Sequence, residues 1–135
     1  MKLLLGLIAL VSVSAFAQSQ AVPTAGFCAI VENSLDANRT NFLVVNNGDR
    51  IKNLNRVRMN DNSGDWDNKI SIVTVHRGCA MIGFQYQDFN IDYRTGARLE
   101  GFAELFANRT AAETKTFVLD SYTNDKISSV KCFCK

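Results

Sequence analysis

The chain has only one histidine, His76, among its 135 residues. A metal cluster built on several histidines is therefore excluded, and a Ser-His-Asp or Cys-His centre would have to use this single residue. His76 stands beside Arg77 at the end of an expected strand, with no catalytic motif around it. The chain also lacks a Gly-rich phosphate loop, and nothing singles out a pair of carboxylates for glycosidic chemistry. We therefore expect that the protein is not an enzyme.

Neither sign of charge is in clear excess, since 15 Lys and Arg stand against 13 Asp and Glu. Proteins that bind nucleic acids or membrane surfaces usually present a strongly basic face. The near balance argues against both kinds of partner. One small basic cluster, Lys52, Arg56 and Arg58, is interpreted as a solvated face of a loop or strand.

Long apolar runs are absent except for residues 3–13. Lys2 precedes this run, and the small-x-small sequence Ala15-Phe16-Ala17 follows it, which is typical of a secretory signal peptide. The run is too short for a membrane span, so none is expected. We predict a signal peptide over residues 1–17, cleaved after Ala17 or alternatively after Ala21, and a secreted, extracellular protein. The remaining chain has the length of one domain.

Four cysteines in a secreted chain imply two disulfides. Cys132 and Cys134 would share one face of a strand, and a bridge between them would be strained. We therefore expect each of them to pair with Cys28 or Cys79, which leaves two connectivities open. Asn38 and Asn108 begin Asn-x-Thr sequons and are candidate glycosylation sites if the host is eukaryotic.

Sustained helical periodicity is absent too, and short apolar runs bounded by Gly and Asn turns indicate strands. We predict strands over residues 27–31, 42–45, 51–59, 70–75, 79–82, 98–102, 116–119 and 127–133, and allow a short helix within 103–114. The run Gly78-Cys79-Ala80-Met81-Ile82 repeats Gly26-Phe27-Cys28-Ala29-Ile30. The pattern predicts an all-β domain over residues 26–134: a two-sheet sandwich of about eight strands, built from two Greek-key motifs at 26–76 and 78–134.

One six-residue pattern occurs twice, each time just before a strand. The copies are Asp67-Asn68-Lys69-Ile70-Ser71-Ile72 and Asn124-Asp125-Lys126-Ile127-Ser128-Ser129. Each places Asx side chains and hydroxyls in a short loop, and such oxygen atoms are the ligands that Ca²⁺ prefers. The same residues also form ordinary turns without a metal, so both interpretations stay open at this point.

The two copies resemble the signature that typically ends each Greek key of the βγ-crystallin family. The second copy matches it in full, while Ile72 departs from it in the first. The resemblance covers residues 26–134, although the aromatic-glycine pattern that usually opens each key is irregular here: Tyr86 and Tyr93 are followed by Gly96 one place late, and the first key lacks the pattern.

This resemblance implies up to two bound calcium ions, with loops shared between the sites. The implied ligands are Asp67, Asn68, the Lys69 carbonyl and Ser71 in the first loop, and Asn124, Asp125, the Lys126 carbonyl and Ser128 in the second. Only Asp67 and Asp125 bring formal charge, so modest affinity is expected. The acidic loop at residues 60–65 does not fit an EF-hand, because Ile70 falls at the position of the bidentate glutamate.

The leading functional hypothesis is a secreted, monomeric calcium-binding structural module. The alternative is a secreted effector on the same scaffold, such as a protease inhibitor or an antimicrobial toxin, acting on a protein or microbial target through an exposed loop. The candidate loop is residues 85–95, which carries three aromatic side chains.

Overall fold

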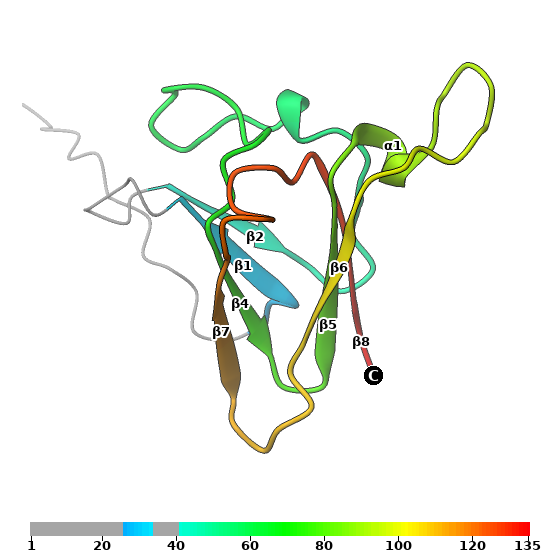
Figure 1. Ribbon diagram of the computed structural model, residues 1–135. Helices are drawn as coiled ribbons and strands as arrows, with labels where there is room; N and C mark the ends of the chain where they lie inside the picture. The colour runs from blue at the N-terminus through cyan, green and yellow to red at the C-terminus, as the bar shows by residue number, and fades with distance from the viewer. Residues whose placement is uncertain (1–25, 34–40) are drawn as a thin grey trace, which may run out of the picture.

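The computed structural model describes residues 26–33 and 41–135, and these form an all-β, sandwich-like fold (Figure 1). The predicted signal peptide and Asn38 lie outside the described residues. The strands are β1 Ala29–Glu32, β2 Phe42–Val45, β3 Arg50–Ile51, β4 Ile72–His76, β5 Cys79–Phe84, β6 Ala103–Ala107, β7 Thr114–Val118 and β8 Ser129–Cys134. A 3-10 turn, Leu54–Arg56, and a short turn labelled α1, Gln87–Asn90, complete the elements.

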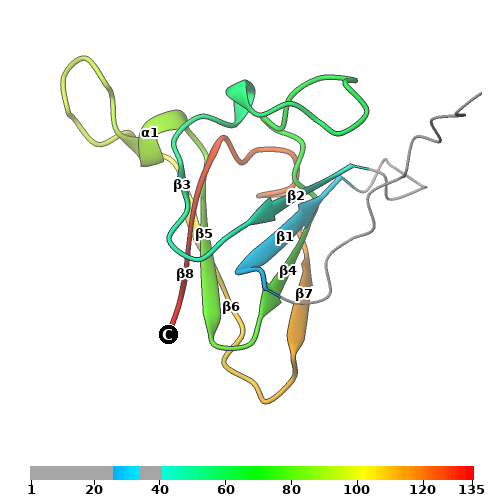
Figure 2. The same cartoon turned by 180° about the vertical axis from the view of Figure 1, so that it is seen from behind.

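Two four-stranded antiparallel sheets face each other, with orders β2-β1-β4-β7 and β3-β8-β5-β6 (Figures 1 and 2). Within each half, the first strand pairs with the second and the fourth, while the third joins the opposite sheet. Glu32 pairs with Ile72 and Phe84 with Ser129, so the halves are offset by 52 residues in the first strand and 57 in the last. The structural equivalent of Cys28 is therefore Ala80, and not Cys79 as the sequence repeat suggested.

The core lies between the sheets because alternate residues of each strand point inward. β4 shows the alternation directly: Val73 and Val75 are fully buried, and their neighbours are half-buried. Trp66, Leu54 and Met81 fill the same interior and are also fully buried. Burial of these large side chains is the main stabilising contribution to such a fold.

Three predicted elements differ in the structure. The strand predicted over 51–59 is only the end of β3, followed by the 3-10 turn and a single bridge between Arg58 and Asp65. Residues 98–102 form a loop in which only Arg98 bridges back, to Ile91. The helix allowed within 103–114 is wrong: residues 103–107 are β6, because pairing with β5 outweighs the helical propensity of Ala-Glu-Leu-Phe-Ala.

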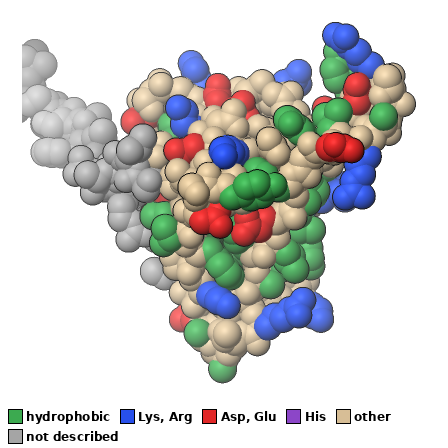
Figure 3. All heavy atoms as spheres, in the orientation of Figure 1, with side chains coloured by type: hydrophobic (Ala, Val, Ile, Leu, Met, Phe, Trp, Pro, Cys, Tyr) green, Lys and Arg blue, Asp and Glu red, His purple; other side chains and the backbone are tan. Residues whose placement is uncertain are grey.

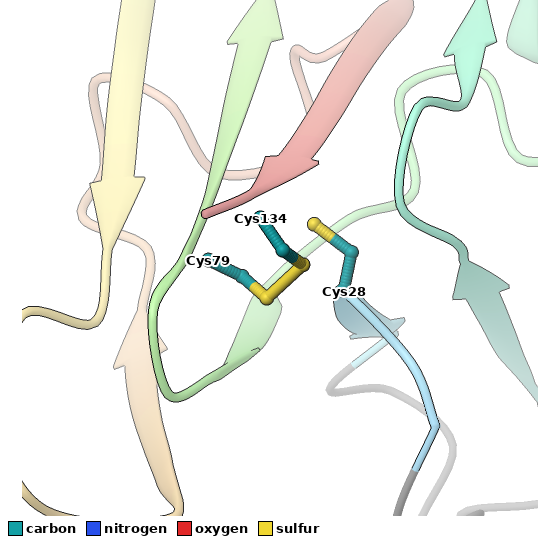
Figure 4. Close-up of side chains that lie close together, drawn as sticks. All are labelled: Cys28, Cys79 and Cys134. Carbon is teal, nitrogen blue, oxygen red and sulfur yellow. A yellow bond between two sulfur atoms is a disulfide. The ribbon is translucent and has the colours of Figure 1, made fainter.

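Two disulfides are present, Cys28–Cys132 and Cys79–Cys134, which confirms the expected pairing of each C-terminal cysteine with an upstream one. The first joins the start of β1 to β8 in the other sheet. The second joins directly opposed residues of β5 and β8. The sulfurs of Cys28, Cys79 and Cys134 lie within 4.8 Å of one another (Figure 4), so the bridges form one cluster at this end of the sandwich. Among the described residues, no helix is long and apolar enough to cross a membrane.

Candidate metal centre

The two Asx-Asx-Lys-Ile-Ser loops lie against each other and exchange side-chain contacts. Ser71 Oγ in the first loop donates to Asp125 Oδ1 in the second, at 3.1 Å. Ser128 Oγ in the second loop donates to Asn68 Oδ1 in the first, at 3.4 Å. Each hydroxyl therefore meets the Asx side chain of the opposite loop. The predicted site residues come together as two crossed pairs rather than as two separate loops.

Backbone hydrogen bonds also join the two loops to each other. Asn68 N donates to Ile127 O at 3.1 Å, and Asp125 N donates to Ile70 O at 3.0 Å. Asn68 and Asp125 have φ values of 56° and 55°, in the left-handed region that Asn and Asp tolerate better than most residues. The isoleucines between the ligand positions are fully buried and anchor both loops to the core. The Asx-x-Ile order therefore supplies both a left-handed turn and its anchor.

The carbonyls of Lys69 and Lys126 are the next candidate ligands. Within the described part of the chain, the backbone bonds at these loops use the carbonyls of Ile70 and Ile127 and leave those of the two lysines without a donor. Each crossed pair thus has one hydroxyl, one Asx oxygen and one available carbonyl in its two loops. This donor set consists of oxygens only, which fits a hard cation such as Ca²⁺.

The two loops contain the same Asx residues in opposite order. In the first loop, Asn68 Nδ2 donates to Asp67 Oδ2 at 3.4 Å; in the second, Asn124 Nδ2 donates to Asp125 Oδ2 at 3.2 Å. We call the Asx residue that accepts a hydrogen bond from the serine of the opposite loop the crossing residue. It is a carboxylate, Asp125, in the Ser71–Asp125 pair, and an amide, Asn68, in the Ser128–Asn68 pair. The Ser71–Asp125 pair has the higher ligand charge.

Two buried polar atoms at the first loop lack a hydrogen-bond partner among the described residues. One is Asp67 Oδ1 and the other is Trp66 Nε1. Buried polar atoms are usually satisfied, so a free carboxylate oxygen beside the crossed pairs is consistent with a cation. Nothing in the structure explains the free Trp66 N–H.

Ser129, the last residue of the second motif, has a different role from Ser128. Its Oγ donates to Tyr86 O at 2.6 Å and accepts from Phe89 N at 3.1 Å. It thereby holds the turn α1, in which Asp88, Phe89 and Asn90 all have positive φ. Three such residues in succession are costly and persist only where the surroundings fix them. Ser129 therefore anchors this turn, and the hydrogen bonds of its side chain go to α1 rather than to the crossed loops.

The loop that follows α1 projects from the body of the domain (Figure 1) and is braced internally. Asp92 N donates to Ala97 O at 2.9 Å, Gly96 N to Asp92 O at 2.7 Å, and Arg94 N to Asp92 Oδ1 at 2.8 Å. Tyr93 at its tip is 75% exposed. A hollow of about 400 Å³ at its base is lined by residues of α1, by residues of this loop and by Ser128. The aromatic side chains of the candidate effector loop thus divide between Phe89, which is buried, and the exposed Tyr86 and Tyr93.

The acidic loop at residues 60–65 is closed by hydrogen bonds of its own. Asp61 Oδ1 accepts from Ser63 N at 2.8 Å, and Asp61 Oδ2 accepts from Asn41 Nδ2 at 2.8 Å. Hydrogen bonds from Ser63 and Asn41 lower the pKa of the Asp61 carboxyl below its ordinary value. These contacts give the loop a structural role.

The second sequon is built into the fold. Asn108 is fully buried, and its Nδ2 donates to Val75 O at 3.2 Å and to Ala112 O at 3.0 Å. Thr110 Oγ1 donates to Asn108 Oδ1 at 2.7 Å, so the sequon forms a turn that ties the β6–β7 loop to β4. In the folded domain the Asn108 amide has no exposed surface to carry a glycan.

His76 contacts the Phe27 ring edge-on and has no nucleophile among its described contacts.

No protein-family model, no curated protein and no solved structure matches the chain. The fold and the crossed loops therefore have to be interpreted from their own geometry.

Proposed function

We propose that the protein is a secreted calcium-binding module of the βγ-crystallin type, built from two Greek keys and without enzymatic activity. The strand orders support the Greek-key part of this proposal, because the fourth strand of each half returns beside the first. The two disulfides are compatible with an extracellular environment.

The crossed contacts of Ser71 with Asp125 and of Ser128 with Asn68 carry the calcium part of the proposal. One site would use Ser71, Asp125 and the Lys69 carbonyl, and the other Ser128, Asn68 and the Lys126 carbonyl. Asp67, whose buried Oδ1 is free, would be a further ligand at the first loop, and Asn124 would support Asp125. Since each site draws on both halves, calcium would bind the folded state and stabilise the association of the two keys.

The proposal is tested by titrating the purified, oxidised protein with calcium in a calorimeter and by melting it with calcium and with chelator. We expect two binding events and a higher melting temperature with calcium. Ser71→Ala and Ser128→Ala should each remove one event, whereas Ser121→Ala, at an exposed position in the turn before the second motif, should remove none. An absence of heat together with unchanged melting would contradict calcium binding.

The projecting loop favours a second candidate, a secreted effector that contacts a protein target. An internally braced loop loses little entropy on binding, and Tyr and Arg are enriched among the residues that dominate binding energy. Tyr93 and Arg94 stand together at the tip, where Arg94 Nε donates to Tyr93 Oη at 2.8 Å. Inhibition of a protease panel or killing of microbes, lost in a Tyr93→Ala Arg94→Ala variant, would support this role, and no activity in either assay would contradict it.

A further inference from the structure

The outer face of the sheet β3-β8-β5-β6 is apolar over β5 and β6. Met81 and Phe106 point into the core, so the residues that alternate with them point outward. On β5 and β6 these outward residues are all apolar: Ala80, Ile82, Phe84, Ala103, Leu105 and Ala107. A solvated sheet face normally carries polar residues. The outer face of the other sheet is mixed: it carries Thr74 and Thr116, whose hydroxyls are 3.0 Å apart, beside Ile30, Ile72 and Val118.

Part of this apolar face is open to solvent. Leu105 is 50% exposed and Phe133, on β8, is 46% exposed. Figure 3 shows hydrophobic side chains gathered over β6, with cationic side chains nearby. Exposed apolar patches of this kind mark protein or membrane contact sites.

Two cations continue one cross-strand row of this face. Arg50 is opposite Lys131, Lys131 is opposite Ile82, and Ile82 is opposite Leu105. The row therefore runs from two positive charges to two aliphatic side chains over four neighbouring strands. A partner that covers it must be anionic at one end and apolar at the other.

The two cations are not neutralised within the domain. Neither forms an ion pair with a carboxylate of the described residues, and both stand over the Phe89 ring, with Lys131 Nζ at 4.2 Å and Arg50 Cζ at 5.2 Å from its centroid. Burial and the Arg50 charge lower the pKa of Lys131. Like charges directly opposite each other destabilise a sheet. Phe89 itself is held in a left-handed conformation by Ser129. The contacts of both cations with the Phe89 ring offset part of the cost of this arrangement and leave the two charges without an anionic partner among the described residues.

We propose that this face, defined by Arg50, Lys131, Ile82, Leu105 and Phe133, docks on the surface of a membrane that contains anionic lipids. Leu105 and Phe133 enter the interfacial region while Arg50 and Lys131 meet the lipid phosphates. The near-neutral net charge of the chain does not exclude this, because the two cations are distant in sequence but lie opposite each other on paired strands and act locally. The proposal uses none of the crossed-loop residues, so it stands or falls independently of calcium binding.

The test is co-sedimentation of the protein with vesicles of phosphatidylcholine alone or mixed with phosphatidylglycerol, in chelator so that calcium cannot bridge protein and lipid. We expect binding to the mixed vesicles only, weakened by added salt. The double variant Arg50→Gln Lys131→Gln should bind about 30-fold more weakly, at about fivefold for each cation. Leu105→Ser Phe133→Ser should also lose binding, and Arg50→Lys Lys131→Arg should retain it.

The other sheet supplies matched controls. Lys115 stands 5.1 Å from the Phe117 ring centroid, and Val118 is 77% exposed, both on β7. Lys115→Gln and Val118→Ser should leave vesicle binding unchanged. Equal loss in these controls, equal binding to neutral vesicles, or no binding at all would overturn the proposal. So would a dimer in sedimentation experiments that Leu105→Ser Phe133→Ser dissociates, since the face would then belong to a second copy.

Discussion

The two Asx-Asx-Lys-Ile-Ser loops form the same backbone and side-chain contacts, yet they differ in two places. Asp125 places a carboxylate at the crossing position of the second loop, where Asn68 places an amide in the first. The second motif ends in Ser129, which anchors α1, whereas the first ends in Ile72, which is half-buried in β4. The buried isoleucine and the left-handed Asx residue are common to both loops and form their shared scaffold. The two loops differ in the charge of the crossing residue and in the last residue of the six-residue motif.

Because both loops share this scaffold, we expect replacement of either buried isoleucine to cause a similar, large loss of stability. Ile70→Ala and Ile127→Ala should each lower the free energy of unfolding by about 2–5 kcal/mol, because each leaves a cavity in the core. Denaturant unfolding in chelator measures this, with the 46% exposed Ile91→Ala as the control, expected within about 0.5 kcal/mol of the parent. A small loss at only one isoleucine would break the equivalence of the loops.

Ser129, the last residue of the second motif, should contribute to stability only in the second half of the domain. Ser129→Ala should cost about 1–3 kcal/mol, because Phe89 N–H loses its partner in a buried environment. Hydrogen exchange at Phe89 should accelerate, while exchange in β1 and β2 stays as in the parent. Unchanged exchange at Phe89 would show that the turn is held by other contacts.

Because the crossing residue is charged in one pair and neutral in the other, we expect the two proposed sites to bind calcium with unequal affinity. Asp125→Asn should weaken the tighter binding event about tenfold, and Asn68→Asp should strengthen the weaker event by a similar factor, because ligand charge tunes affinity. Calorimetry resolves both changes. Asp49→Asn, in the turn between β2 and β3, serves as the control. Equal affinities in the parent would remove the proposed asymmetry.

The smallest effect concerns Asp61, beside the first loop. Its pKa is lowered by hydrogen bonds in the folded state, so its stabilising contribution is present above the ordinary value of 3.8 and is lost as pH falls through the lowered value. The difference in melting temperature between the parent and Asp61→Ala should therefore shrink in acid. A difference that grows in acid would contradict the sign of the shift.

The sequence predicts the strands and turns that depend on residues close together in the chain. β2 and β4 follow from short apolar runs, and the turn residues of both loops follow from their Asx and Ser content. Residues 103–107 contain Ala and Leu and favour a helix locally, and only their pairing with β5 makes them a strand. The sequence does not predict the neighbouring positions of Arg50 and Lys131, because the two residues are distant in sequence and meet only through the pairing of β3 with β8.

The crossed arrangement is tested most directly by following backbone amide resonances of the oxidised protein during a calcium titration. The account predicts two sets of shifts, each spanning both loops: Lys69 to Ser71 with Asp125 in the tighter event, and Lys126 to Ser128 with Asn68 in the weaker one. Shifts confined to a single loop in each event, or no shifts in either loop, would contradict it.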